Sequence, residues 1–343
     1  MKQKVVTAVS VAALAGISVI GIGFFAKPFA QTEKTAQAAV SQSADVVKET
    51  VIVTEVSTVI ASEEADSISL EQTTEPVGRE LKKPVSSSRV SKEDIFYMML
   101  NSIDYYDKIS GTIYVHYGNI DFYEAVTFQC ALSDTAAYAH EIQYDCNQPA
   151  AASAAECAEQ MKSAEAAVLR DVETSCTGEQ LYYVDHSRSA YRQEQSYNIT
   201  TLEQAGPVSD EERHFTMDDG FPAYSYRANP TNIPSASICL FPQEMTFGYL
   251  TDTDLWEIKG VEKLNGRTCY HITGVTGAEY GKKRNVASFE FFVDTNTGVL
   301  LKYVGYDTNG NISDYLYSEN MQFEEKAEAV KAAPIPRSYQ NEG

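Results

Sequence analysis

The chain has 343 residues, and its 48 acidic side chains outnumber the 27 basic ones, which gives a formal net charge of −21. A chain this acidic repels a phosphate backbone and carries no basic stripe to offset the repulsion, so we expect no nucleic-acid partner. The length is enough for one or two domains with hydrophobic cores.

The first predicted element is an export signal in residues 1–30. Lys2 and Lys4 precede an uncharged, mostly apolar run, residues 5–25. Such a run after a positive start directs export across a membrane. It can be removed at a small-x-small site that begins at Ala36, or it can stay as an anchor, because about 20 apolar residues span a bilayer. The sequence leaves both fates open, and both predict an extracytoplasmic protein.

Residues 31–91 have the composition of a disordered linker. Ser, Thr, Glu, Ala and Val dominate, and no aromatic side chain is present. Such a segment buries too little apolar surface to fold by itself. We therefore expect the folded domain in residues 92–323, followed by a disordered tail in residues 324–343.

The domain is expected to begin with a helix and to continue mainly as strands. Ser91 is an N-cap candidate with Asp94 three residues later, and apolar residues follow at helical spacing. Alternating apolar and polar runs after this helix predict strands. Residues 150–169 are rich in good helix formers, although their later part can also join a strand. Residues 200–250 are rich in Pro and Gly, which predicts an irregular insertion or a lid.

The most regular part of the chain is residues 256–323. Asn-Gly pairs at Asn265 and Asn309, and a turn that ends at Gly298, separate apolar or β-branched runs. Asn-Gly between two such runs is the strongest short-range signal for a β-hairpin, because both residues accept positive φ. We therefore expect roughly ten or eleven mostly antiparallel strands with helical insertions, arranged as a sandwich or as a curved, barrel-like sheet.

The six cysteines leave two readings open. No two of them form a C-x-x-C pair, so zinc and thioredoxin-like sites are not indicated. An exported chain with an even number of cysteines permits disulfides, and Cys146 with Cys157 would close a Pro- and Ala-rich insertion. Alternatively, the cysteines are buried free thiols that pack as small apolar side chains.

No residue pattern marks a catalytic or metal site. The turns that begin at Asp294 and Asp307 lack the Glu that a calcium loop needs at its twelfth position, and both lie between strands. His140-Glu141 begins like a zinc-protease motif, but Tyr144 stands where the second His is required. We predict a non-enzymatic protein without cofactor or metal; a surface hydrolase with an unmarked carboxylate pair is the least favoured alternative.

The aromatic content also has two interpretations. The chain has 22 Tyr and 14 Phe but one Trp. Tyrosine packs well on a half-buried sheet, which explains the content without a ligand. Alternatively, one sheet face holds an apolar ligand beneath the Pro-rich segment and the first helix. The candidate lining residues of that site are Met98, Met99, Tyr114, Phe128, Tyr183, Phe247, Phe291 and Tyr303.

The hairpin turns resemble those of a known family, the LolA-like exported proteins. This family includes the outer-membrane lipoprotein carriers and, more distantly, the MucB/RseB-type regulators. The resemblance covers residues 92–323 loosely and residues 256–320 best. The matching positions are Gly266-Arg267, Val293-Asp294, Thr297-Gly298, Leu301-Lys302, Tyr306-Asp307 and Gly310.

The resemblance implies a fold and two kinds of partner. The implied fold is an incompletely closed antiparallel barrel with a helical lid and a hydrophobic cavity. The carrier branch implies a lipid or an acylated lipoprotein as the ligand. The regulator branch implies an envelope-stress or interaction module that binds another membrane protein.

Overall fold

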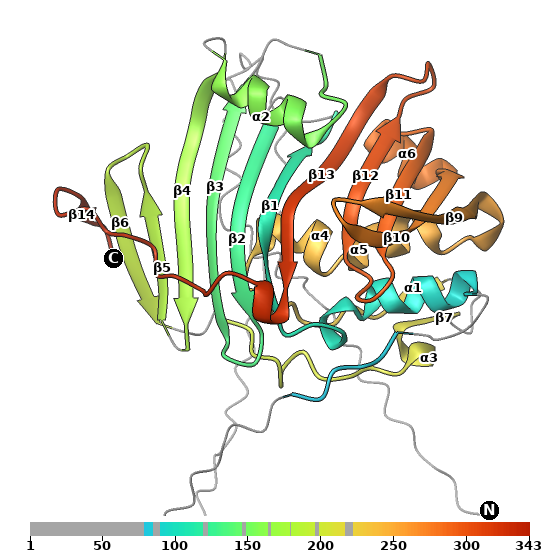
Figure 1. Ribbon diagram of the computed structural model, residues 1–343, viewed down its shortest axis with the longest axis horizontal. Helices are drawn as coiled ribbons and strands as arrows, with labels where there is room; N and C mark the ends of the chain where they lie inside the picture. Colours follow the sequence, from blue (N-terminus) through green and yellow to red (C-terminus); the bar gives the residue numbers. More distant parts are fainter. Residues whose placement is uncertain are drawn as a thin grey trace, which may run out of the picture. The chain divides into compact units, whose positions relative to one another are not determined.

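The computed structural model describes residues 79–84, 90–118, 123–145, 149–163, 166–178, 180–195, 199–216 and 222–343 (Figure 1). These residues belong to one structural unit, residues 72–343. The expected export signal and most of the expected linker lie outside the described residues. Within the described ranges, no helix is both long and apolar enough to cross a membrane.

A single twelve-stranded sheet organises the domain, in the order β14-β6-β5-β4-β3-β2-β1-β13-β12-β11-β10-β9. All pairs are antiparallel except β14 with β6. Two meanders, β1 to β6 and β9 to β13, become one sheet where β1 pairs with β13. The strands of the first are β1 (Lys108–His116), β2 (Tyr123–Ala131), β3 (Ala136–Asp145), β4 (Ala167–Thr177), β5 (Gln180–Asp185) and β6 (Ala190–Gln195).

The second meander contains the hairpins predicted from sequence. Its strands are β9 (Trp256–Leu264), β10 (Arg267–Val275), β11 (Ser288–Asp294), β12 (Leu300–Tyr306) and β13 (Ile312–Phe323). Asn265 and Gly266 have φ of 50° and 80°, and Gly298 and Gly310 have φ of 73° and 83°. Positive φ is what tight hairpin turns require. The predicted mainly β, curved and open antiparallel sheet is confirmed, because β9 and β14 remain separate edges.

Six helices and a small hairpin accompany the sheet within the described residues. They are α1 (Lys92–Leu100), α2 (Ala154–Lys162), α3 (Asp210–Arg213), α4 (Ser237–Leu240), α5 (Gln243–Leu250), α6 (Ala278–Arg284), and the strands β7 (His214–Thr216) and β8 (Pro222–Tyr224). Helix α1 begins with the predicted capping box of Ser91 and Asp94. The sequence allowed either a helix or a strand in the later part of residues 150–169. The structure has both, since these residues contain helix α2 and the start of β4.

The two faces of the sheet pack against different elements. The inner face carries Val126, Phe128 and Phe291, and with α1, α4 and α5 it forms the main hydrophobic core. The outer face carries Tyr144 and Tyr315, which form a smaller cluster with α2. Side chains alternate along a strand, so neighbouring residues of β1 and β2 serve opposite faces.

Two segments expected to be disordered are held by the domain. Arg79 Nη2 donates to the carbonyl of Ile103 at 2.6 Å, so the described end of the linker is bound. The tail, residues 324–343, crosses the outer face and ends as β14 (Gln340–Asn341) beside β6. Tail composition did not indicate this order, because side chains of distant strands supply the contacts that hold the tail.

The cysteines match the free-thiol reading where the structure describes them. Cys130, Cys157, Cys176, Cys239 and Cys269 are buried, and no disulfide joins any two of them. The suggested partner of Cys157, at position 146, lies outside the described residues, so that pairing stays a prediction.

The turn before β12 provides a test of packing between α1 and the sheet. A Cβ at Gly298 would lie 2.5 Å from the carbonyl oxygen of Met98, whereas a Cβ at Gly310 would meet nothing within 4 Å. Both glycines have positive φ, so Gly310→Ala should cost about 1 kcal/mol and Gly298→Ala roughly 2 to 4 kcal/mol. Urea unfolding midpoints measure both, and equal costs would contradict the packing of this turn against α1.

Candidate functional site

Six of the eight predicted lining residues meet in the main core on the inner face. They come from α1, α5 and three strands that are distant in sequence. Each is at most 6% exposed. These six residues are Met98, Met99, Phe128, Phe247, Phe291 and Tyr303.

The other two predicted residues lie elsewhere. Tyr114 is on the outer face of β1, in the cluster with α2, because Ile113 and Val115 take the inner positions. Tyr183 is half-buried on β5, between two guanidinium groups. The Arg192 guanidinium lies 4.5 Å from the centre of its ring, and the Arg170 guanidinium lies 6.0 Å away. Alternation alone could not predict either placement, because it does not identify the covered face.

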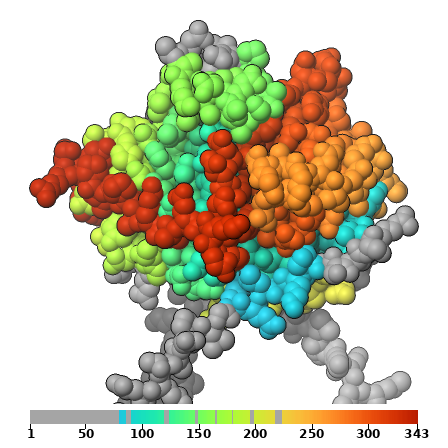
Figure 2. Space-filling view, in the orientation of Figure 1, coloured from blue at the N-terminus to red at the C-terminus, as the bar shows by residue number. Residues whose placement is uncertain are grey.

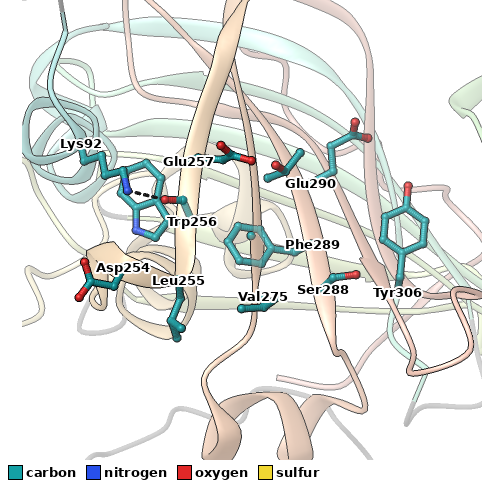
Figure 3. A pocket seen from close by; sticks show the side chains of 12 residues that line it. Lys92, Asp254, Leu255, Trp256, Glu257, Val275, Ser288, Phe289, Glu290 and Tyr306 are labelled. Atoms are coloured by element: carbon teal, nitrogen blue, oxygen red, sulfur yellow. Dashed lines mark hydrogen bonds between the residues drawn. The ribbon is translucent and has the colours of Figure 1, made fainter.

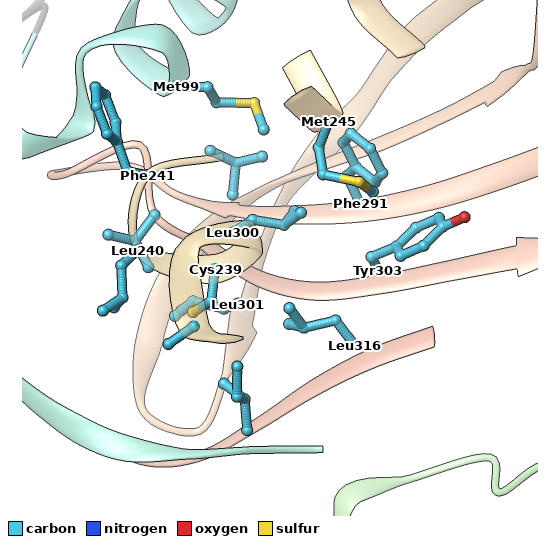
Figure 4. Packing of buried hydrophobic residues seen from close by; sticks show 14 of the residues in the cluster. Met99, Cys239, Leu240, Phe241, Met245, Phe291, Leu300, Leu301, Tyr303 and Leu316 are labelled. Atoms are coloured by element: carbon cyan, nitrogen blue, oxygen red, sulfur yellow. The ribbon is translucent and has the colours of Figure 1, made fainter. Parts of the chain in front are cut away.

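A lid, defined as residues 199–216 and 222–250, covers the core on the inner face. Its helices α4 and α5 carry Leu240 and Met245 into the same cluster as Phe291 (Figure 4). Helix α5 is buried on most of its surface, since six of its eight residues are buried. It therefore lies inside the core, and α1 packs against it.

Polar contacts fix the ends of the two lid helices. The carbonyl of Leu240 at the end of α4 accepts bonds from Ser102 Oγ at 2.7 Å and Tyr106 Oη at 3.2 Å. The carbonyl of Leu250 at the end of α5 accepts a bond from Trp256 Nε1 at 3.0 Å. The last carbonyls of a helix have no partner within it, so these bonds satisfy buried groups that would otherwise be unpaired.

Two buried arginines attach the β7–β8 region of the lid to the end of α1. Arg227 forms a two-pronged ion pair with Asp104, at 2.9 and 3.0 Å. Arg213 donates to the carbonyl of Leu100 and to Gln243 Oε1, both at 2.6 Å. Burial acts to raise the pKa of Asp104, but its contacts with Arg227 and, to a smaller extent, with Lys82 outweigh burial and hold the pKa below its usual value. These bonds of the two buried guanidinium groups hold this part of the lid against the end of α1, although Nε of Arg213 has no hydrogen-bond partner.

A hydrogen-bonded chain links α5 to the sheet inside the core. The hydroxyl of Tyr249 on α5 bonds to the hydroxyl of Tyr303 on β12. Tyr303 Oη donates to Asp314 Oδ2 on β13 at 3.3 Å, and the amide of Gly118 donates to Asp314 Oδ1 at 2.8 Å. Burial raises the pKa of Asp314. This chain joins lid and sheet through Tyr303, which is one of the predicted lining residues.

Beyond the lid, the inner face becomes polar. Glu124 on β2 accepts a bond from Gln143 Nε2 at 3.0 Å. Burial, and then the nearby carboxylate of Glu141, raise the pKa of Glu124 to about 7, although Arg170 opposes this effect. Glu141 also accepts a bond from Ser235 Oγ of the lid at 2.7 Å. Sequence reasoning missed these residues, since only the pairing of β2, β3 and β4 brings them together.

A separate pocket of about 660 Å³ lies beside the start of α1, where β9 and β11 begin and β10 and β12 end (Figure 3). Lys92 and Trp256 line it, and Lys92 Nζ donates to the carbonyl of Trp256 at 2.5 Å. Glu290, also in the lining, is bound by His271 at 2.9 Å and Lys302 at 2.8 Å. Lys92 and Glu290 are thus engaged within the protein, and we take the inner face as the candidate functional site.

Comparisons with known proteins give structural neighbours only. No protein-family model matches the chain, and no curated protein matches it. An uncharacterized conserved protein from Thermus thermophilus is 10% identical over 74% of this chain and 98% of its own, with a TM-score of 0.33. LprF from Mycobacterium bovis is 10% identical over 75% of this chain and 100% of its own, with a TM-score of 0.34.

MucB is a third similar structure, 12% identical over 71% of this chain and 63% of its own, with a TM-score of 0.35. MucB is also one of the proteins that the sequence resemblance names. The TM-scores are low, so these structures carry no conclusion about what the chain binds. The fold class rests on the strand order and the open edges of the sheet.

The raised pKa of Glu124 predicts a pH dependence of stability. The folded protein holds the proton of Glu124 up to a pH of about 7, whereas an unfolded chain releases it near 4.5. The folded state therefore binds more protons in this window, and the free energy of unfolding should fall by about 1 to 3 kcal/mol as pH rises through it. Glu124→Gln should remove this part of the slope, and the exposed variant Glu211→Gln should keep it. Urea unfolding from pH 4 to 8 measures the slope, and identical slopes in both variants would contradict the assignment.

Proposed function

We propose that this protein is a non-enzymatic, extracytoplasmic binding domain that holds an apolar ligand, a lipid or an acylated protein, between the lid and the inner face. The observation that carries the proposal is the layer of apolar side chains from separate segments where lid and sheet meet. Leu240 and Met245 of the lid, Met99 of α1, and Leu300 and Leu301 of β12 belong to it (Figure 4).

This layer is filled with the protein's own side chains, so a ligand must replace them. Met99 and Met245 have unbranched, adaptable side chains, which can rearrange around a new apolar group. An acyl chain with about a dozen methylene groups gains roughly 10 kcal/mol on burial, at about 0.8 kcal/mol for each group. That gain offsets the several kcal/mol that displacing a short, packed helix costs, because the ligand restores most of the lost apolar contacts.

Helix α5 is the element most suited to move. It has eight residues and no side-chain cap at its N-terminus. Helices shorter than about 12 residues are marginal by themselves, so α5 depends on its packing. Its contacts with α1, the bond between Tyr249 and Tyr303, and the bonds from Arg213 to Gln243 and from Trp256 to the Leu250 carbonyl together keep the core closed.

The location in the proposal comes from the sequence. The predicted export signal in residues 1–30 places the domain outside the cytoplasm. The domain would be anchored through residues 5–25 or released after cleavage. Either fate exposes the site to lipids and acylated proteins of the envelope.

A second candidate function, binding to another membrane protein, rests on the outer surface of the lid. Phe215, Tyr224 and Tyr226 are 48%, 40% and 56% exposed, which is unusual for three aromatic side chains of one small region. Glu244 is exposed on α5, and burial of the Tyr226 hydroxyl, followed by the charge of Glu244, raises the pKa of Tyr226. An aromatic surface beside acidic residues would suit a basic, apolar partner, and salt would weaken that contact.

Native mass spectrometry of the purified protein, before and after organic extraction, tests the proposal. We expect an additional mass that disappears on extraction, with tandem spectra that identify an acyl chain. A bare polypeptide mass in both samples, together with no saturable binding of an apolar fluorescent probe, would reject the apolar-ligand function and favour the protein-binding candidate.

Loosening the lid should speed ligand entry. Tyr249→Phe removes one buried hydrogen bond between α5 and β12, worth about 1 kcal/mol, and should increase the open population and the association rate of an apolar probe about fivefold. Stopped-flow fluorescence measures the rate. Tyr182→Phe is the matched control, because the Tyr182 hydroxyl bonds to exposed Gln180 at 2.7 Å, away from the lid. Equal rates in the two variants would show that α5 does not control entry.

A further inference from the structure

The C-terminal tail follows a defined course across the outer face. It leaves the end of β13, passes in front of β2, β3 and β4, and ends beside β6 (Figure 1). In Figure 2 its red atoms form a continuous band over the green strands. An extended segment thus crosses the strands that it contacts, and only its last residues pair along one of them.

Four side chains beneath the tail form a straight row across four strands, which we call the outer row. Ser110 on β1 pairs with Gln129 on β2, Gln129 pairs with Tyr138 on β3, and Tyr138 pairs with Ser175 on β4. All four are at most 4% exposed. Three of the four are Ser or Gln, an uncommon choice for a covered surface.

The outer row binds the backbone of the tail. Three tail amides donate to side-chain oxygens of the row at 2.9 to 3.0 Å. These bonds are Glu328 N to Ser110 Oγ, Lys331 N to Gln129 Oε1, and Ala333 N to Ser175 Oγ. Backbone amides are common to all polypeptides except at proline, so this contact recognises an extended chain as such.

Side-chain contacts add sequence preference. Gln129 Nε2 donates to Glu328 Oε2 at 2.9 Å, and Lys331 Nζ lies 4.3 Å from the centre of the Tyr138 ring. Ala333 packs against Tyr138 in a small apolar cluster. The row therefore selects an acidic residue, a cation three positions later and a small residue five positions later.

The tail can dissociate from the outer face without breaking the pairing of the other strands. Within it, regular structure is limited to one 3₁₀ turn, Glu324–Lys326, and the two residues of β14. Glu324, where the tail begins, has φ of 53°, in the left-handed region that disfavours a non-glycine residue. Glu324 accepts a bond from the amide of Asp107 at 2.9 Å and can stay in place, and release of the residues after it would leave all eleven antiparallel strands of the sheet paired as before.

We propose that the outer row is a binding site for an extended polypeptide segment, which the tail fills within its own chain. A partner segment with the pattern of the tail, Glu-x-x-Lys-x-Ala, displaces the tail and takes its place. The tail acts as a tethered competitor, since its effective concentration at the row is far above that of a free segment. This site is separate from the proposed apolar-ligand site, which lies on the inner face.

The test uses the full chain with a protease recognition sequence inserted between Lys326 and Ala327. After cleavage, we expect the fragment 327–343 to stay bound on size exclusion. We expect a fluorescent synthetic peptide of residues 327–343 to exchange into the cleaved protein saturably. The uncleaved protein should bind the peptide at least about tenfold more weakly, because the tethered tail competes.

Two variants of β2 separate recognition from mere loss of folding. Gln129→Ala removes the two hydrogen bonds that Gln129 forms with Glu328 and Lys331 of the tail. It should weaken peptide binding about tenfold or more. Thr127→Ala lies on the same strand, is exposed and bonds to Thr112 Oγ1 at 3.1 Å, so it should bind as the parent does. Circular dichroism checks that both fold. Loss of the fragment without peptide rebinding, or equal binding by the two variants, would overturn the proposal.

Discussion

The pairing of β1 with β13 is the contact on which the rest of the structure depends. It joins the two meanders, so that an inner face runs without interruption from β6 to β9. The register shifts between Ser110 and Thr112, beside Gly111. A Cβ at Gly111 would clash with Met321 Sδ, so the glycine lets β13 pack closely at this point. Without this seam, each meander would expose an apolar face too large to leave in water.

An open sheet of this size has two faces that other parts of the chain must cover. The lid covers the inner face with apolar contacts, and the tail covers part of the outer face with hydrogen bonds. The inner face is apolar beneath the lid, and the lid meets it with Leu, Met and Phe side chains whose contacts have no direction. The outer face offers Ser110, Gln129 and Ser175, whose hydrogen bonds fix both the position and the direction of the tail. Non-directional contacts tolerate replacement by another apolar body, whereas directional contacts tolerate only another polypeptide backbone.

The sequence predicted what depends on neighbouring residues and missed what depends on distant ones. Asn265-Gly266 and Gly298 specify their turns by local φ preference, so the second meander was predictable strand by strand. The face on which Tyr114 lies depends on which of its neighbours the helices cover, and that information is not local. The tail is the clearest case, because Ala333 is held by Ser175, 158 positions away. Six of the predicted lining residues lie in one core because large apolar side chains of strands and helices converge there with or without a ligand, so their role as a ligand site stays a prediction.

The two faces share their strands, yet their contacts belong to different residues. On β2, Phe128 enters the inner core while Gln129 holds the tail. A ligand that moves α5 changes contacts of inner residues, and a segment that displaces the tail changes contacts of outer residues. The backbone hydrogen bonds of β1 to β4 stay in place in both events, because neither the lid nor the row supplies them. For binding on one face to affect binding on the other, the strands would need a second conformation. A close-packed, fully paired central sheet resists such a change. The two proposed sites would therefore act independently, with the sheet as a rigid layer between them.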